Sequence, residues 1–247
     1  MKNILNIYSL LLKKFGWQNW WPITPKGKLT PIYPDGIHSR ELSEKEMFEI
    51  SLGAILTQNT SWKNVEKAII CLNKNKLVSP YKIRDIEREK LAGIIRSSGY
   101  FNQKAIKLKT FAEWFIKCHN GSMKIFFSSG DLAGLRNELL SIKGIGPETA
   151  DSILLYAGNK PIFIIDAYTK RIFSRIGIQE QDYHKLQKFF MDNLPRDTII
   201  YKEYHALIVQ LGKDFCTKRK PLCKKCPLTN NCMKTVKENF KYNKYEV

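Results

Sequence analysis

The residues of this chain best suited to chemistry include a cluster of cysteines near its end. Four of the six cysteines follow the pattern Cys216-x6-Cys223-x2-Cys226-x5-Cys232. Four thiolates at such short spacings are typical of a metal site, either zinc or an iron–sulfur cluster. Zinc sites commonly use two cysteine pairs that a longer loop separates. The gaps of six, two and five residues therefore favour a cubane cluster, with zinc as the alternative.

A single carboxylate, Asp166, is the second candidate. It follows the apolar run Pro161–Ile165 and precedes a segment with helical character, Ala167–Phe173. An aspartate in this position commonly caps a helix, because its side chain accepts a hydrogen bond from a free backbone N–H group. A carboxylate at the mouth of a cleft can also orient water or stabilise positive charge. The two roles are compatible.

A glycine turn between two helical segments is the third candidate, at Leu140–Ala150. Gly144 and Gly146 permit a sharp turn and close approach of another molecule to the backbone. Pro147 and Glu148 suit the first turn of the following helix. Since free N–H groups at a helix start bind anions, this turn could hold a phosphate. A tight corner without a ligand is the alternative.

Composition indicates a globular protein with a polyanionic partner. The 41 Lys+Arg against 23 Asp+Glu give a formal net charge of +18. Such an excess is typical of nucleic-acid binding, although it can also serve solubility. The sequence has no apolar run of about 18 residues, so we expect no membrane span. The first 15 residues lack a signal-peptide cleavage site, and we expect an amphipathic helix in a cytoplasmic protein.

The elements that must position these residues are helices. Apolar residues recur with helical period along most of the chain, and only Pro161–Ile165 resembles a strand. We therefore predict an all-α fold in which Ser43 and Glu46 form a capping box. Two lone cysteines, Cys71 and Cys118, are expected to be buried thiols. The predicted helices cover residues 1–15, 47–56, 62–70, 83–95, 105–118, 132–140, 150–157 and 167–173.

Tryptophans and a polar patch flank the first internal helix. Three tryptophans lie at positions 17, 20 and 21, before a long connection from Ile23 to Ser43. They could form a platform for a planar ligand or pin the connection to the core, and we favour the second role for Trp17. Gln58 follows an almost wholly apolar helix, which makes a projecting role possible.

Together, the glycine hairpin, Asp166 about 20 residues later and the cysteine pattern resemble the endonuclease III superfamily of helix-hairpin-helix base-excision DNA glycosylases. The resemblance implies two helical domains with DNA bound across the cleft. One is a six-helix barrel, here residues 41–160. The other combines residues 1–40 and 161–247 and carries a [4Fe–4S] cluster on Cys216, Cys223, Cys226 and Cys232.

One departure from the superfamily pattern concerns the hairpin. Bifunctional members carry a lysine two residues after the second glycine, where this chain has Glu148. A carboxylate cannot form a Schiff base, so the lyase route through an amine is absent. Because Asp166 is kept, the pattern implies a monofunctional glycosylase that uses water and leaves an abasic site.

A closer similarity is to the 3-methyladenine DNA glycosylase III branch. Its marks are Trp20-Trp-Pro22, the segment from Phe48 to Thr60, and Gly99–Lys104. This similarity implies release of an alkylated purine from double-stranded DNA by a monomer. Alternatives are an oxidised, deaminated or mismatched base as substrate, and a non-catalytic iron–sulfur protein that binds damaged DNA. The implied roles are a base pocket of Trp21, Pro22 and Phe48, Gln58 as the intercalating side chain, phosphate contacts at Gly144, Ile145, Gly146 and Thr149, and catalysis by Asp166.

Overall fold

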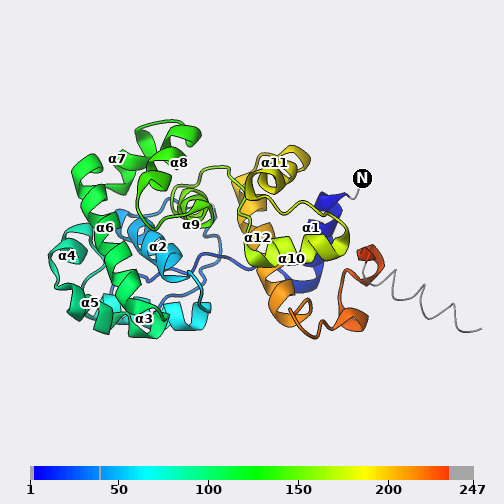
Figure 1. Ribbon diagram of the computed structural model, residues 1–247, viewed down its shortest axis with the longest axis horizontal. Coiled ribbons are helices and arrows are strands. Elements are labelled where there is room, and N and C mark those ends of the chain that lie inside the picture. Colours follow the sequence, from blue (N-terminus) through cyan, green and yellow to red (C-terminus); the bar gives the residue numbers. More distant parts are fainter. Residues whose placement is uncertain (1–2, 39, 234–247) are drawn as a thin grey trace, which may run out of the picture. The chain divides into compact units, whose positions relative to one another are not determined.

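A computed structural model describes residues 3–38 and 40–233, and its chain divides into two compact units. One unit contains residues Asn19–Lys160, and the other combines Met1–Gln18 with Pro161–Val247. Figure 1 shows the helices of each unit. The predicted all-α class is confirmed, because the only β pairing in the described residues is an isolated bridge between Ile23 and Ile32. No helix in this part of the chain is long and apolar enough to cross a bilayer.

Helix α2 (Glu44–Leu56) is the centre of the unit of residues 19–160. The predicted capping box is present, with the Ser43 side chain accepting from the Glu46 N–H and the Glu46 side chain accepting from the Ser43 N–H. From Met47 to Leu56 every residue of the helix is buried, which agrees with its apolar sequence. Around it lie α3 (Trp62–Lys74), α6 (Phe101–His119), α7 (Met123–Ser128) and α9 (Pro147–Ser152), which continues as the π-helix η2 (Ile153–Ala157). Helix α8 (Leu132–Ser141) packs on α9.

The helix predicted over residues 83–95 is wrong in its extent. The chain forms two short helices instead, α4 (Pro80–Asp85) and α5 (Arg88–Ile94), followed by the 3₁₀ turn η1 (Arg96–Ser98). Ile86 is extended, with a ψ of 143°. The Lys109 ammonium group donates to the carbonyl oxygens of Ile83, Arg84 and Ile86, which satisfies groups that a continuous helix would have paired.

Residues 19–40 belong to the same unit as α2, and not to the terminal-segment domain in which we placed them. The cause is a set of buried contacts. The ring of Trp21 lies so close to Gly53 of α2 that a Cβ there would be 3.1 Å from it. The backbone N–H of Thr24 donates to the buried carboxylate of Glu49, which also accepts from Asn73. Trp21 pins this connection, whereas Trp17 is 55% exposed, contrary to our expectation.

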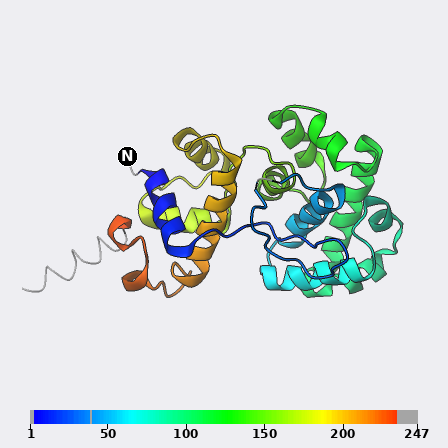
Figure 2. The ribbon, with the colours of Figure 1, turned by 180° about the vertical axis from the view of Figure 1, so that it is seen from behind.

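The other unit is built from both ends of the chain. Its helices are α1 (Ile4–Phe15), α10 (Ala167–Ile176), α11 (Tyr183–Asn193) and α12 (Thr198–Asp214), with 3₁₀ turns η3 (Cys223–Lys225) and η4 (Thr229–Asn231). Helix α1 packs on α12, as Figure 2 shows from behind, through the buried face that the sequence predicted. Segment 161–165 is buried but forms no strand, and Gln187 donates to its Phe163 carbonyl.

Candidate active site

Asp166 begins helix α10 as its N-cap, as the sequence predicted. Its Oδ1 atom accepts two hydrogen bonds from Thr169, one from the backbone N–H at 2.7 Å and one from the hydroxyl group at 2.8 Å. Both residues are buried, with Asp166 only 7% exposed. Helix α10 packs closely on α12 because Gly212 of α12 has no side chain. A Cβ at this position would lie 2.2 Å from the ring of Tyr168 in α10.

The second oxygen of Asp166 faces a histidine of α12. Nε2 of His205 lies 3.7 Å from Oδ2, the distance of an ion pair rather than of a short hydrogen bond. Burial by itself raises the pKa of Asp166, but the imidazole of His205 and the two hydrogen bonds from Thr169 lower it by more. The net pKa lies below the ordinary value, so Asp166 is a carboxylate at neutral pH.

A buried ion pair fixes the two arms of the helix-hairpin-helix. Arg136 of α8 donates from Nε and Nη2 to the two oxygens of Asp151 in α9, at 2.7 and 3.2 Å. The Asp151 side chain is fully buried and that of Arg136 is 16% exposed. A bidentate pair of this kind sets the angle between the helices, and with it the shape of the turn that joins them.

The two glycines of the hairpin differ in whether the fold requires a glycine at their position. Gly144 has a φ of +95°, and a Cβ on it would lie 2.9 Å from the side chain of Lys107. Gly146 has a φ of −98°, and no atom lies within 4 Å of a Cβ built there. The fold therefore explains a glycine at position 144, whereas at position 146 it leaves open backbone that another molecule could approach.

Gln58 contacts the hairpin directly. Its amide donates to the Gly144 carbonyl at 3.2 Å and to the Thr149 hydroxyl at 2.9 Å, and its Oε1 accepts from the ammonium group of Lys107. The structure thus brings together Gln58, Gly144 and Thr149 of the predicted residues. Ile145 is buried, and its N–H donates to Ile142, so this group is already used within the turn.

The sequence does not indicate Lys107 as a site residue. Its spacing in α6 is that of an ordinary half-exposed helical lysine, and only the fold brings it to Gln58.

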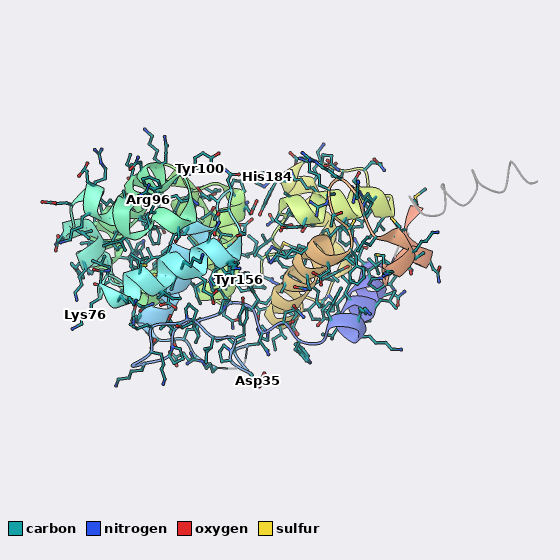
Figure 3. All side chains as sticks on the ribbon, turned by 90° about the horizontal axis from the view of Figure 1, so that it is seen from below. Asp35, Lys76, Arg96, Tyr100, Tyr156 and His184 are labelled. Carbon is teal, nitrogen blue, oxygen red and sulfur yellow. The ribbon has the colours of Figure 1, made fainter. Side chains whose placement is uncertain are left out.

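An aromatic cluster surrounds Trp21. The ring centroids of Trp20, Trp62 and Tyr156 lie 5.4, 5.4 and 5.2 Å from that of Trp21. Tyr33 adds a further contact to Trp20 at 5.5 Å. Figure 3 labels Tyr156, which comes from the π-helix. We call Trp20, Trp21, Tyr33, Trp62 and Tyr156 the aromatic cluster.

The members of this predicted base pocket are not all neighbours. Pro22 is buried directly after Trp21, but Phe48 stacks on Phe111 and Phe115 in the core. Trp62 was not predicted as a site residue, since its sequence position reads as the start of a helix. Its indole N–H is buried and has no hydrogen-bond acceptor among the described residues.

The four clustered cysteines are half-buried neighbours in the loop after α12. Burial and the charges of the other three thiols raise the pKa of Cys226 to about 11. Arg175 of α10 donates to the sulfur of Cys216 at 3.1 Å, and the thiol of Cys232 donates to the Arg175 carbonyl at 3.3 Å. Within residues 3–38 and 40–233, no three His, Cys, Asp or Glu side chains are grouped so that they could hold a single metal ion.

Two further cysteines lie outside this cluster. Cys118 is exposed and Cys71 half-buried, so the expected burial of these thiols is wrong for Cys118.

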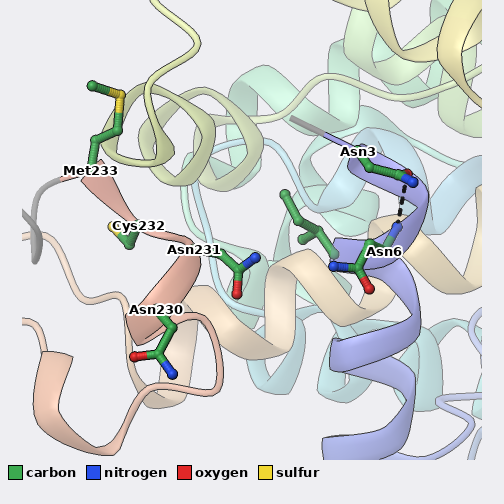
Figure 4. Close-up of a pocket in the computed structure, with 7 residues that line it drawn as sticks. Asn3, Asn6, Asn230, Asn231, Cys232 and Met233 are labelled. Atoms are coloured by element: carbon green, nitrogen blue, oxygen red, sulfur yellow. Dashed lines mark hydrogen bonds between the residues drawn. The ribbon is translucent and has the colours of Figure 1, made fainter. Parts of the chain in front are cut away.

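A cavity of about 290 Å³ lies between the start of α1 and the end of the cysteine loop (Figure 4). Four asparagines line much of it, and Cys232 is its single titratable residue.

A helix-hairpin-helix whose arms are locked together, followed by a buried aspartate at the next helix start, defines a class of helical DNA-repair proteins. The chain belongs to the HhH-GPD superfamily of base excision DNA repair proteins, whose sequence profile matches residues 52–196. The predicted family is thereby confirmed.

Individual relatives agree with this assignment. A Methanocaldococcus jannaschii protein with the provisional name DNA repair glycosylase is 43% identical over 232 residues, 93% of this chain and 96% of the relative. Endonuclease III of Sulfolobus acidocaldarius is 30% identical over 76% of this chain and 82% of its own length. A crystal structure of H. pylori 3-methyladenine DNA glycosylase bound to 1,N6-ethenoadenine matches with a TM-score of 0.67 and 28% identity, over 86% of this chain and 98% of that one.

Proposed function

We propose that the protein is a monofunctional DNA glycosylase that releases an alkylated purine, such as 3-methyladenine, and leaves an abasic site. The observation that carries this proposal is the state of Asp166, an ionised buried carboxylate with one oxygen held by Thr169. The similarity to a 3-methyladenine glycosylase supports the choice of substrate.

The aromatic cluster supports capture of an extruded base. Moving a base out of the duplex costs a few kcal/mol, which stacking on aromatic rings offsets. An N3- or N7-alkylated purine carries a positive charge, and a cation over an aromatic ring gains roughly 0.5–2 kcal/mol. The unpaired indole N–H of Trp62 offers a donor to an acceptor atom of such a base.

Asp166 supplies the chemistry in this proposal. The bond between C1′ and the base nitrogen breaks, and its electron pair leaves with the base, whose positive charge is thereby neutralised. The sugar becomes cationic, and the carboxylate of Asp166 stabilises it, as carboxylates do in other glycosyl transfers. Water then attacks C1′ and gives its proton to Oδ2, the oxygen that Thr169 does not contact. No general acid is needed, since the leaving base is already charged.

Hydrolysis without strand cleavage follows from Glu148. This residue occupies the first turn of α9 and is exposed, so its carboxylate suits the positive end of the helix but cannot act as an amine nucleophile. We infer that the protein does not form a covalent Schiff base with DNA.

Double-stranded DNA is the proposed partner. The net charge of +18 suits a phosphate backbone, and the open backbone at Gly146 suits close approach of one phosphate. Gln58, which lies against the hairpin, would fill the gap that the extruded base leaves. Exposed lysines and arginines of the cysteine loop extend the basic surface, at positions 218, 219, 220, 224 and 225.

We further propose that the four cysteines hold a [4Fe–4S] cluster. Each thiolate of such a cluster binds a different iron atom, so neighbouring sulfurs need not converge on one point. The four thiols lie close enough together for the charges of the other three to act on Cys226. An N–H group of Arg175 also donates to the sulfur of Cys216, and both observations fit this ligand set. The bound cluster would hold the basic loop in one conformation. Equal amounts of iron and acid-labile sulfide in the purified protein would support the cluster, whereas stoichiometric zinc would contradict it.

A base-release assay tests the proposed activity. Duplexes that contain alkylated, oxidised, deaminated or mismatched bases are incubated with excess protein, and the free bases are separated by chromatography. We expect release of alkylated purines. Release confined to oxidised or mismatched bases would favour the endonuclease III-like alternative, which the similarity to the Sulfolobus endonuclease III supports. Inactivity on every lesion would favour a protein that binds damage without catalysis.

A further inference from the structure

The two oxygens of Asp166 have different surroundings. Oδ1 is occupied by the two hydrogen bonds from Thr169, whereas Oδ2 faces the imidazole of His205. His205 is 8% exposed and Asp166 is 7% exposed, so both side chains are shielded from bulk water. The oxygen left for the reaction is therefore the one that the histidine can influence.

Other titratable groups belong to elements of the same unit. Lys213 of α12 is close enough to the reactive carboxylate that their charges interact. Lys202 lies one turn before His205 in α12 and is buried. From α11, the Tyr183 hydroxyl accepts from the Ile165 N–H at 3.5 Å, and from α1, Tyr8 packs on Tyr204.

We propose that His205 is a positioning residue that relays the proton of the attacking water away from Asp166. This inference rests on the proposed glycosylase function. The water oxygen forms its bond to C1′ and its proton moves to Oδ2. Neutral His205 then accepts that proton at Nε2, which restores the carboxylate. The imidazolium later loses the proton to solvent, so the protein ends the cycle unchanged.

A pH dependence of the rate follows. When His205 is protonated before the reaction, Nε2 has no lone pair to offer, and the imidazolium occupies the Oδ2 atom. The rate of base release should therefore rise as the imidazolium of His205 loses its proton. The leaving base cannot cause this rise, since an alkylated purine is already cationic.

Single-turnover base release by His205→Gln tests the proposal. The glutamine amide can still donate toward Oδ2 but cannot titrate. On methylated duplex DNA with saturating protein, we expect a rate lower by roughly 100-fold at pH 8, the lower end of what a positioned proton acceptor contributes. The deficit should shrink toward pH 5, so that the variant's profile is flat. His184→Gln, at an exposed histidine of α11, should keep the wild-type profile.

Two results would overturn the inference. One is a His205→Gln profile parallel to that of the wild type, whether or not the rate is lower, because a structural role acts equally at each pH. The other is failure of free imidazole to restore activity to His205→Ala, which also covers the case in which His205→Gln does not fold. If the wild-type protein itself releases no base from any lesion, the proposed function fails instead, so the two failures are distinguishable.

Discussion

Thr169 donates both its backbone N–H and its hydroxyl to a single oxygen of Asp166, at 2.7 and 2.8 Å. The first turn of α10 thus fixes the carboxylate on one side and leaves Oδ2 for other partners. The cap that starts the helix and the group that we assign to catalysis are the same side chain. Changes to Thr169 should consequently affect stability and activity together.

Replacing Thr169 by valine tests this linkage. Valine keeps the shape of the side chain but removes one hydrogen bond to a buried carboxylate. We expect a free energy of unfolding lower by about 1.5–3 kcal/mol at pH 7, the range for hydrogen bonds to charged groups. Denaturant titration measures it, and Thr169→Ser, which keeps the hydroxyl, is the control. Equal stability of Thr169→Val and the wild type would contradict the role of this bond.

The two hairpin glycines provide a matched pair of substitutions. Gly144→Ala should lower stability by more than about 1 kcal/mol, because φ is +95° and Lys107 is in the way. Gly146→Ala should leave stability within about 0.5 kcal/mol, since its φ is ordinary and the space is open. It should nevertheless weaken binding to duplex DNA, measured by fluorescence anisotropy. Wild-type affinity of Gly146→Ala would argue against a phosphate contact at this position.

Glu148→Lys should introduce the amine that this chain lacks. In the presence of borohydride and a duplex with a damaged or abasic site, we expect a covalent protein–DNA adduct from the variant and none from the wild type. The lysine at a helix start should cost only about 0.3–1 kcal/mol. An adduct of the wild-type protein would show that another lysine acts as nucleophile. Glu148→Gln, which removes charge without adding an amine, is the control.

Burial of Lys202 should make the free energy of unfolding depend on pH. Burial lowers its pKa to about 8 in the folded protein, from an ordinary value of 10.5. Burial therefore costs stability below pH 8, and the cost is relieved as the pH rises from 8 to 10.5, because only the unfolded chain still binds the proton there. Lys202→Met should be more stable than the wild type by on the order of 3 kcal/mol at pH 7. The difference should vanish near pH 10.5, and a difference independent of pH would contradict this account.

Features that depend on neighbours in sequence were predicted correctly. The capping box at Ser43, the buried helix that it opens and the N-cap role of Asp166 each involve residues within a few positions of one another. Local hydrogen bonding and apolar periodicity determine such features, so the sequence pattern suffices. The glycine turn followed by Pro147 is of the same kind.

Contacts between distant residues could not be predicted. The break at Ile86 depends on Lys109, and the surroundings of Gln58 depend on Lys107, both supplied by α6. Likewise, nothing in the sequence near Asp166 indicates His205, which lies on a helix two elements later. Tertiary packing determines which distant residues come into contact, and the local sequence pattern does not indicate these contacts.

Base release by Asp166→Asn tests the central claim most directly. Asparagine still caps helices well, so the variant should fold and bind DNA as the wild type does. Asp182→Asn is a matched control, because Asp182 caps α11 in the same way but is exposed. On methylated duplex DNA we predict a loss of at least roughly 100-fold in the single-turnover rate for Asp166→Asn and none for Asp182→Asn. Release of methylated purines by Asp166→Asn at the wild-type rate would contradict the assignment of Asp166 to catalysis.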